Sequence, residues 1–116
     1  MKIQAQNGGV SLQSSADEYC SLNNLMNEIL HGFNPGDRFD VKGGEGEVAR
    51  VLLRSFNQRC EGGGEMYLTL SDAETLLKAI AIVGEALKGR HLENRVGISH
   101  DDLRGVIEHF ENALKM

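Results

Sequence analysis

Residues that could recognise a partner or do chemistry form two groups in this sequence. The first is a polar stripe with i, i+3, i+4 and i+7 spacing, which consists of Asn24, Asn27, Glu28 and His31. This spacing places the side chains on one face of a helix, which either binds a partner or is simply solvated. The second group is titratable and lies near the C-terminus: His100, Asp101, Asp102, Glu108 and His109.

Neither group has the pattern of a catalytic or metal site. Helical spacing turns the members of the titratable group toward different sides, so they do not obviously converge. The histidines form no HExxH or HxxxH pattern, and the cysteines form no CxxC pair. Ser15, Ser71 and Ser99 are explained as helix caps, and the stretches GGEGE and EGGGE lack the pattern of a phosphate-binding loop. We expect no catalytic residue, no metal site and no cofactor.

Length and charge restrict the class of protein. The 116 residues suit one domain, 1–116. The net charge of −5 is spread along the chain, which argues against a nucleic-acid partner and suits a basic protein partner. The longest apolar run, AIAIVG, is too short to span a membrane, and MKIQAQNGG lacks the apolar region of a secretory signal. We therefore expect a cytoplasmic protein without a membrane partner. In that compartment Cys20 and Cys60 are expected to be free thiols, with a disulfide between them as the alternative.

The first half predicts a hairpin followed by two helices. KIQAQ and VSLQS alternate apolar and polar residues around the turn NGG. Ser15 and Glu18 form an S-x-x-E capping box, and the helix that follows is expected to stop at Gly32. A second helix is expected from about Glu45, with an inward face that consists of Val48, Val51, Leu52 and Phe56.

The second half predicts the same order of elements. SFNQRC alternates and is expected to form a second hairpin with EMYLTL, turning at EGGG. A helix is then expected to begin at the capping box Ser71–Glu74, and GRHLENRVG links it to a last helix capped by Ser99. The helix over 71–88 has a broad apolar face that suggests a homodimer contact and includes Ala79, Ala81 and Ile82.

These similarities indicate an internal duplication. Aligning Ser14 with Ser71 also aligns Ala16 with Ala73, Glu28 with Glu85, and Gly32 with Gly89. We interpret residues 1–57 and 58–116 as two repeats, each a ββαα unit. Because a lone hairpin is marginal in water, two hairpins side by side are expected to form a small antiparallel sheet with helices packed on one face. The predicted fold is therefore α+β with a pseudo-twofold axis.

Two short signatures resemble a known group of proteins. LNNLMNEILHGF, residues 22–33, has the pattern LNN-x-x-NE-x-x-x-G, and RVGISHDDLRGVI, residues 95–107, has the pattern R-x-G-x-S-x-x-D/E. With these segments the chain resembles a group of small, uncharacterised bacterial proteins. The resemblance implies a strand that leads into the first helix and a second segment that leads into the last helix. It implies no activity.

We interpret the chain as a binding protein without catalysis, of the immunity or antitoxin type that neutralises a cognate toxin by direct binding. Free carboxylates on a small acidic domain would meet a basic toxin domain and capture it rapidly. The expected partner-binding residues are Asn24, Asn27, Glu28, His31, Asp101 and Asp102. Two alternatives stay open: a homodimeric scaffold, and a small enzyme that uses the titratable group of the last helix.

Overall fold

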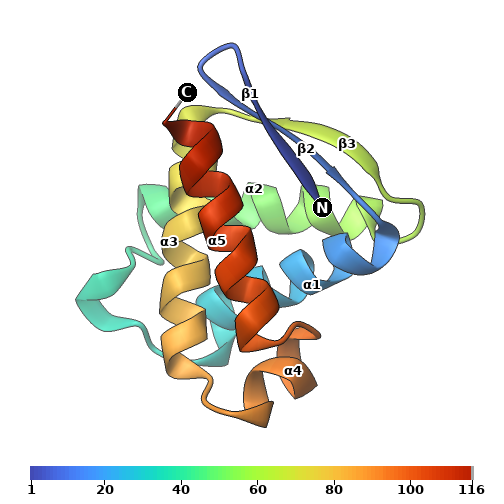
Figure 1. Cartoon of the computed structure of the whole chain (residues 1–116). Coiled ribbons are helices and arrows are strands. Elements are labelled where there is room, and N and C mark those ends of the chain that lie inside the picture. Colours follow the sequence, from blue (N-terminus) through green and yellow to red (C-terminus); the bar gives the residue numbers. More distant parts are fainter. Residues whose placement is uncertain (116) are drawn as a thin grey trace.

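The chain begins with the hairpin that the sequence predicts. In the computed structural model, which describes residues 1–115, β1 (Lys2–Gln6) and β2 (Gly9–Ser14) pair antiparallel. Asn7 and Gly8 form the turn with positive φ angles of 49° and 84°, which suit the twist of a two-residue hairpin turn. β3 (Gly64–Leu68) pairs antiparallel with the other edge of β2, so the strand order is β1-β2-β3 (Figure 1).

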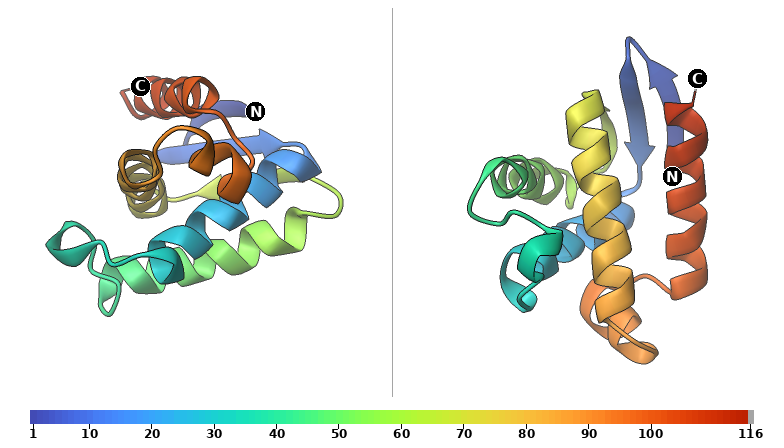
Figure 2. Two further views of the ribbon diagram at one scale, coloured as in Figure 1. Left: turned by 90° about the horizontal axis from the view of Figure 1, so that it is seen from below. Right: turned by 90° about the vertical axis from the view of Figure 1, so that its left-hand side faces the viewer.

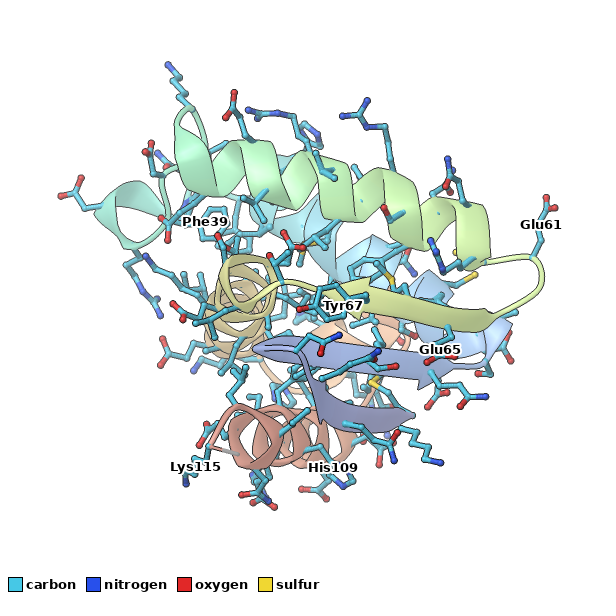
Figure 3. All side chains as sticks on the ribbon, turned by 90° about the horizontal axis from the view of Figure 1, so that it is seen from above. Phe39, Glu61, Glu65, Tyr67, His109 and Lys115 are labelled. Carbon is cyan, nitrogen blue, oxygen red and sulfur yellow. The ribbon has the colours of Figure 1, made fainter. Side chains whose placement is uncertain are left out.

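Helices cover one face of this sheet. Alternation points Val10, Leu12 and Leu68 toward the helices, where all three are fully buried. On the opposite face, Ser11 Oγ donates a hydrogen bond to Glu65 Oε1 at 2.6 Å. Figure 3 looks onto the strands and shows Glu65 and Tyr67 on β3. The predicted α+β class, with a small antiparallel sheet and helices on one face, is confirmed.

The helices form two pairs. α1 (Ala16–Asn27) continues as a π-helical turn, η1 (Glu28–Gly32), and packs along α2 (Gly44–Arg59). A short 3-10 turn, η2 (Gly36–Arg38), lies between them in the chain. α3 (Leu70–Ala86) packs along α5 (His100–Leu114), and the short helix α4 (Arg90–Val96) connects these two. Figures 1 and 2 show α3 and α5 running antiparallel and crossing the first pair.

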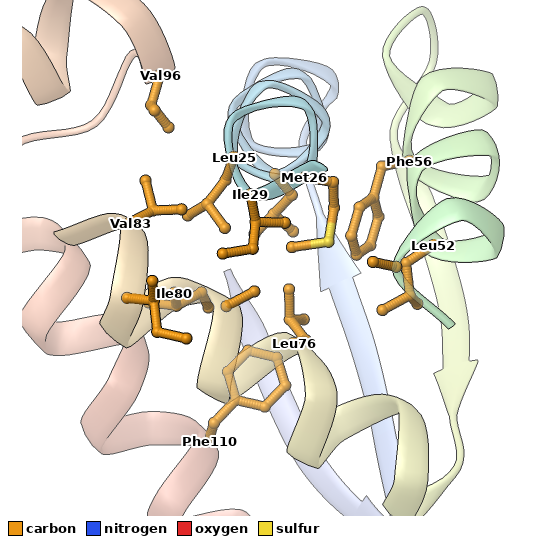
Figure 4. Close-up of a cluster of buried hydrophobic side chains, with 14 of the residues drawn as sticks. Leu25, Met26, Ile29, Leu52, Phe56, Leu76, Ile80, Val83, Val96 and Phe110 are labelled. Carbon is orange, nitrogen blue, oxygen red and sulfur yellow. The ribbon is translucent and has the colours of Figure 1, made fainter. Parts of the chain in front are cut away.

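α3 lies at the centre of the hydrophobic core. Figure 4 shows its side chains Leu76, Ile80 and Val83 among residues from α1, α2, α4 and α5. All three are fully buried, and the buried apolar residues of the chain form one continuous cluster. The breadth of the apolar face of this helix is therefore explained by burial within a single chain. Ala79 and Ile82 are buried there too, whereas Ala81 is exposed, so most of the apolar face of helix 71–88 is used within the chain.

The prediction that SFNQRC forms a strand is wrong. α2 continues through this segment to Arg59. Phe56 and Leu52 are spaced by one helical turn, and both are buried on the same side of α2. The Phe56 ring stacks on Tyr19 of α1 with a centroid distance of 6.1 Å, and burial of such a ring contributes about 1.5–3 kcal/mol. The burial of this helical face stabilises the helix more than the short alternation of apolar and polar residues in SFNQRC favours a strand. Val51, which was expected to face inward, is 53% exposed.

The duplicated ββαα unit and its pseudo-twofold axis are not confirmed. Within residues 1–115 the first half has the order β1-β2-α1-α2, whereas the second has β3-α3-α4-α5. β3 has no hairpin partner of its own and joins the first hairpin instead. The segment GRHLENRVG, predicted as a linker, contains α4. The aligned residues also differ in role, because Ser14 ends a strand while Ser71 lies inside a helix.

α3 begins two residues earlier than the sequence indicates. The N-cap is Thr69, whose Oγ1 accepts from Asp72 N at 3.1 Å, while Asp72 Oδ2 accepts from Thr69 N at 3.1 Å. The capping box is therefore Thr69–Asp72 and not Ser71–Glu74. The predicted caps of the other two helices are confirmed: Ser15 forms a box with Glu18, and Ser99 caps α5.

We predict that Thr69→Ala lowers the free energy of unfolding by about 1 kcal/mol, because it removes the cap of α3. Ser71→Ala should change it by less than about 0.5 kcal/mol, since alanine is a better helix former inside the first turn. Urea denaturation of both variants measures the difference. A larger loss for Ser71→Ala than for Thr69→Ala would place the start of the helix at Ser71 after all.

Candidate functional site

An ion pair between Glu28 and Arg95 joins η1, the continuation of α1, to α4. Arg95 Nη2 lies 2.7 Å from Glu28 Oε1 and donates a hydrogen bond to Oε2 at 3.0 Å. The Glu28 side chain is 12% exposed and that of Arg95 is 46% exposed. Water therefore reaches the guanidinium but hardly the carboxylate. The carboxylate depends on this partner to offset the cost of its burial.

Gly32 leaves the room that this carboxylate occupies. A Cβ at position 32 would lie 2.6 Å from Glu28 Oε2. Gly32 also ends the π-helical turn, and Phe33 after it is extended, so the predicted stop is confirmed. The glycine of the first signature thus accommodates the glutamate of the same signature.

Side chains of α1 also bind carbonyl groups at the end of α4. Asn24 Nδ2 donates to Val96 O at 3.3 Å, and Ser21 Oγ donates to Gly97 O at 3.4 Å. The last carbonyls of a helix have no hydrogen-bond donor within the helix, so the side chains of Asn24 and Ser21 satisfy acceptors that would otherwise be unpaired. Gly97 itself has a positive φ of 91°, which terminates α4 in the left-handed conformation. The two signature segments, residues 22–33 and 95–107, therefore meet in space.

The polar stripe is divided between two roles. Asn24 is half-buried and Glu28 is buried, and both hold α4. Asn27 and His31 are exposed and do not contribute to this contact. Glu85, which aligns with Glu28, is 65% exposed and pairs with Arg38 on the surface.

We predict that Arg95→Gln lowers the free energy of unfolding by about 1–3 kcal/mol, because Glu28 is then buried without its partner. The double variant Glu28→Gln/Arg95→Gln should be at least as stable as Arg95→Gln, since no uncompensated charge remains. Arg38→Gln is the matched control and should cost less than about 1 kcal/mol, because its ion pair is exposed. Urea denaturation compares the four proteins, and equal losses for Arg38→Gln and Arg95→Gln would contradict the assigned role.

A groove of about 540 Å³ lies near the contact between α1 and α4. It is bounded by the start of β1, the first turns of α1 and the first half of α5. Figure 1 shows the N-terminus lying near these two helices. Four apolar residues of the lining are half-buried: Met1, Ile3, Ile98 and Val106. The lining also includes the carboxylates of Asp17, Glu18, Asp101 and Asp102, and His109 of α5. The groove therefore combines apolar walls with negative charge.

The four carboxylates differ in how far they are already neutralised. Glu18 Oε2 lies 2.7 Å from the Met1 ammonium, and Oε1 accepts from Ser15 N at 2.9 Å. Burial raises the pKa of Glu18, but the ammonium and the hydrogen bonds together lower it by more, so the pKa lies below its usual value. Asp101 lies 3.3 Å from Arg104 in an exposed pair. Within residues 1–115, neither Asp17 nor Asp102 has an ion-pair partner.

The structure brings together only part of the predicted site. Asp101 and Asp102 line the groove, whereas Asn24, Asn27, Glu28 and His31 do not. Sequence reasoning missed Asp17 and Glu18, which follow the cap Ser15 just as Asp101 and Asp102 follow the cap Ser99. That common position was the available signal, but nothing in the spacing places the starts of α1 and α5 side by side.

The titratable group of the last helix is also divided. Asp101, Asp102 and His109 reach the groove, and Figure 3 shows His109 on α5. Glu108 is exposed outside the groove lining, and the Nε2 atom of His100 is buried without a hydrogen-bond partner among the described residues. Within residues 1–115, no three His, Cys, Asp or Glu side chains are placed to hold a metal ion.

Cys20 and Cys60 lie next to each other as free thiols. Cys20 Sγ donates to Cys60 O at 3.5 Å, and both residues are half-buried. Burial, together with the neighbouring thiol of Cys20, raises the pKa of Cys60 to about 11. At neutral pH Cys60 is therefore almost entirely protonated, and the thiol is a poor nucleophile.

We predict that iodoacetamide alkylates Cys60 slowly at pH 7 and about ten times faster with each added pH unit, because only the thiolate reacts. The increase should continue to about pH 11, the raised pKa of this thiol. Peptide mass spectrometry separates the modification of Cys60 from that of Cys20. Cys20→Ala should increase the rate at neutral pH, since it removes part of the cause of the raised pKa. A rate that levels off below pH 9 would contradict the prediction.

In comparisons with known proteins, no family model, curated sequence or solved structure matches the chain. Every helix within residues 1–115 is too short or too polar to span a bilayer.

Proposed function

We propose that this protein is a non-catalytic binding protein of the immunity or antitoxin type, which neutralises a basic toxin domain in the cytoplasm by direct binding. The observation that carries the proposal is the groove itself, in which Asp101 and Asp102 are joined by Asp17 and Glu18 above apolar walls. A surface of this kind is complementary to a basic protein segment that also carries apolar side chains.

The charge of the whole chain supports the same partner. The net charge of −5 attracts a basic domain over a distance, and opposite charge speeds association more than it increases final affinity. Asp101 and Asp102 are exposed, so a partner reaches them without any rearrangement of the chain. Rapid capture is what neutralising a toxin requires, because any free toxin damages the cell that makes it.

One observation favours a second candidate, a small enzyme. His109 lines the groove together with Asp101 and Asp102, so an imidazole and two carboxylates share one concave site. General acid–base catalysis uses these groups. The candidate predicts that His109→Gln abolishes the biological effect of the protein while leaving its binding to the partner intact.

We predict that co-expression of this protein rescues cells from a toxin encoded beside its gene, and that Asp101→Asn/Asp102→Asn weakens the rescue. Association with the purified toxin domain should slow by about tenfold at low salt, because two charges at the centre of the interface are lost. Stopped-flow measurements at several salt concentrations give the rate.

Glu108→Gln/Glu111→Gln is the matched control, since it removes two exposed charges of the same helix outside the groove lining. It should slow association far less. Failure to rescue cells from any neighbouring toxin would refute the proposed function, and equal effects of the two double variants would refute the role of the groove.

A further inference from the structure

Gly105 has no structural reason to be glycine. It lies in the middle of α5, and a Cβ placed on it meets no atom within 4 Å. Its φ is not positive, so the backbone conformation is open to other residues. A glycine inside a helix destabilises it relative to alanine. The chain thus keeps an unfavourable residue at a point where larger side chains would fit.

That point is the wall of the groove. Gly105 lies among the lining residues, next in sequence to Val106 and Arg104. A side chain at position 105 would occupy space that is now empty, so the glycine keeps this part of the groove open. The volume of about 540 Å³ falls within the usual range of ligand sites and exceeds what one side chain fills.

The lining selects for a long side chain with a cation at its end. Beside Gly105, the half-buried surfaces of Ile98 and Val106 are apolar and suit an aliphatic stem. Asp17 and Asp102 have no ion-pair partner within residues 1–115 and suit a positive head group. Lysine and arginine have this construction, since they bury their methylenes and keep their charge at the surface.

We propose that the groove is an anchoring site for a lysine or arginine side chain of the partner protein. This side chain inserts beside Gly105, together with an apolar side chain that is its neighbour in the partner. This inference rests on the proposed binding function and specifies which chemistry of the partner is recognised. The aliphatic stem packs on Ile98 and Val106, and the cation is held by the carboxylates of Asp17 and Asp102. Gly105 is then a determinant of specificity, because it provides the space for the stem.

The test uses the whole protein and a small probe, n-hexylammonium, which has the stem and the charge but no other group. Titration into 15N-labelled protein at low salt should give saturable amide shifts at Ile98, Gly105 and Val106, with a dissociation constant in the millimolar range. Hexanoate has the same stem with the opposite charge, and methylammonium has the charge without the stem. Both should bind at least about tenfold more weakly, since each lacks one of the two interactions.

Gly105→Leu should abolish the saturable shifts while the melting temperature stays equal or rises, because leucine occupies the space beside Val106 that the stem needs and favours the helix. Gly44→Leu is the matched control: Gly44 is also helical with open space around its Cβ, and it lies outside the groove lining. Its binding of the probe should be unchanged. If Gly105→Leu does not fold, the double variant Asp17→Asn/Asp102→Asn tests the proposal instead. It should weaken the binding of n-hexylammonium at least about fivefold.

The proposal is overturned if n-hexylammonium gives no saturable shifts, if hexanoate binds as tightly as n-hexylammonium, or if Asp17→Asn/Asp102→Asn binds n-hexylammonium as tightly as the wild-type protein does. The probe assay contains no toxin, so its result is independent of whether a toxin is found. If the wild-type protein rescues cells and a folded Gly105→Leu variant rescues them equally well, the binding function stands and the anchoring site is refuted.

Discussion

The docking of α4 on α1, with the ion pair between Glu28 and Arg95 at its edge, links the two pairs of helices. α4 is too short to be stable by itself. It is held by Leu92 and Val96, which are fully buried in the core, by this ion pair, and by the bonds from Asn24 and Ser21 to its last carbonyls. Because α5 follows almost directly, the place of α4 determines where α5 begins and how far α5 stands from α1. The contacts that hold α4, the buried carboxylate of Glu28 among them, thereby support one side of the groove.

Where local chemistry decides, the sequence was sufficient. The Asn7-Gly8 turn and the Ser15 capping box act within a few residues, and both are found as predicted. The start of α3 is different, since Thr69 and Ser71 each have an acid three residues later. The choice falls on Thr69 because β3 ends at Leu68, which pairs with Val10 of the other half. No local pattern contains that pairing, nor the contact of Phe56 with Tyr19 that keeps α2 helical.

The carboxylates of the groove illustrate the same limit for function. Asp17 and Asp102 lie in the first turns of α1 and α5, where acids stabilise the positive end of a helix dipole. Read singly, each is explained by its own helix. Only in the folded chain do the two helix starts converge, and their carboxylates then form one negative surface. The same positive helix ends that favour the carboxylates also limit their mutual repulsion, which allows the chain to gather so much charge at one place.

The position of β3 has a consequence for biosynthesis. β2 lies between a strand from its own hairpin and a strand made about fifty residues later. The hydroxyl of Tyr19 donates to Gly64 O of β3 at 2.8 Å and lies 3.2 Å from Leu12 O of β2, so its single hydrogen is shared between the two strands. α3, the centre of the core, follows later still. As the chain leaves the ribosome, α1 can pack on α2, but the apolar side of the hairpin and the side of α1 that faces α3 remain uncovered until the second half arrives. The nascent chain is most exposed to aggregation during that interval, and its last two long helices complete the fold.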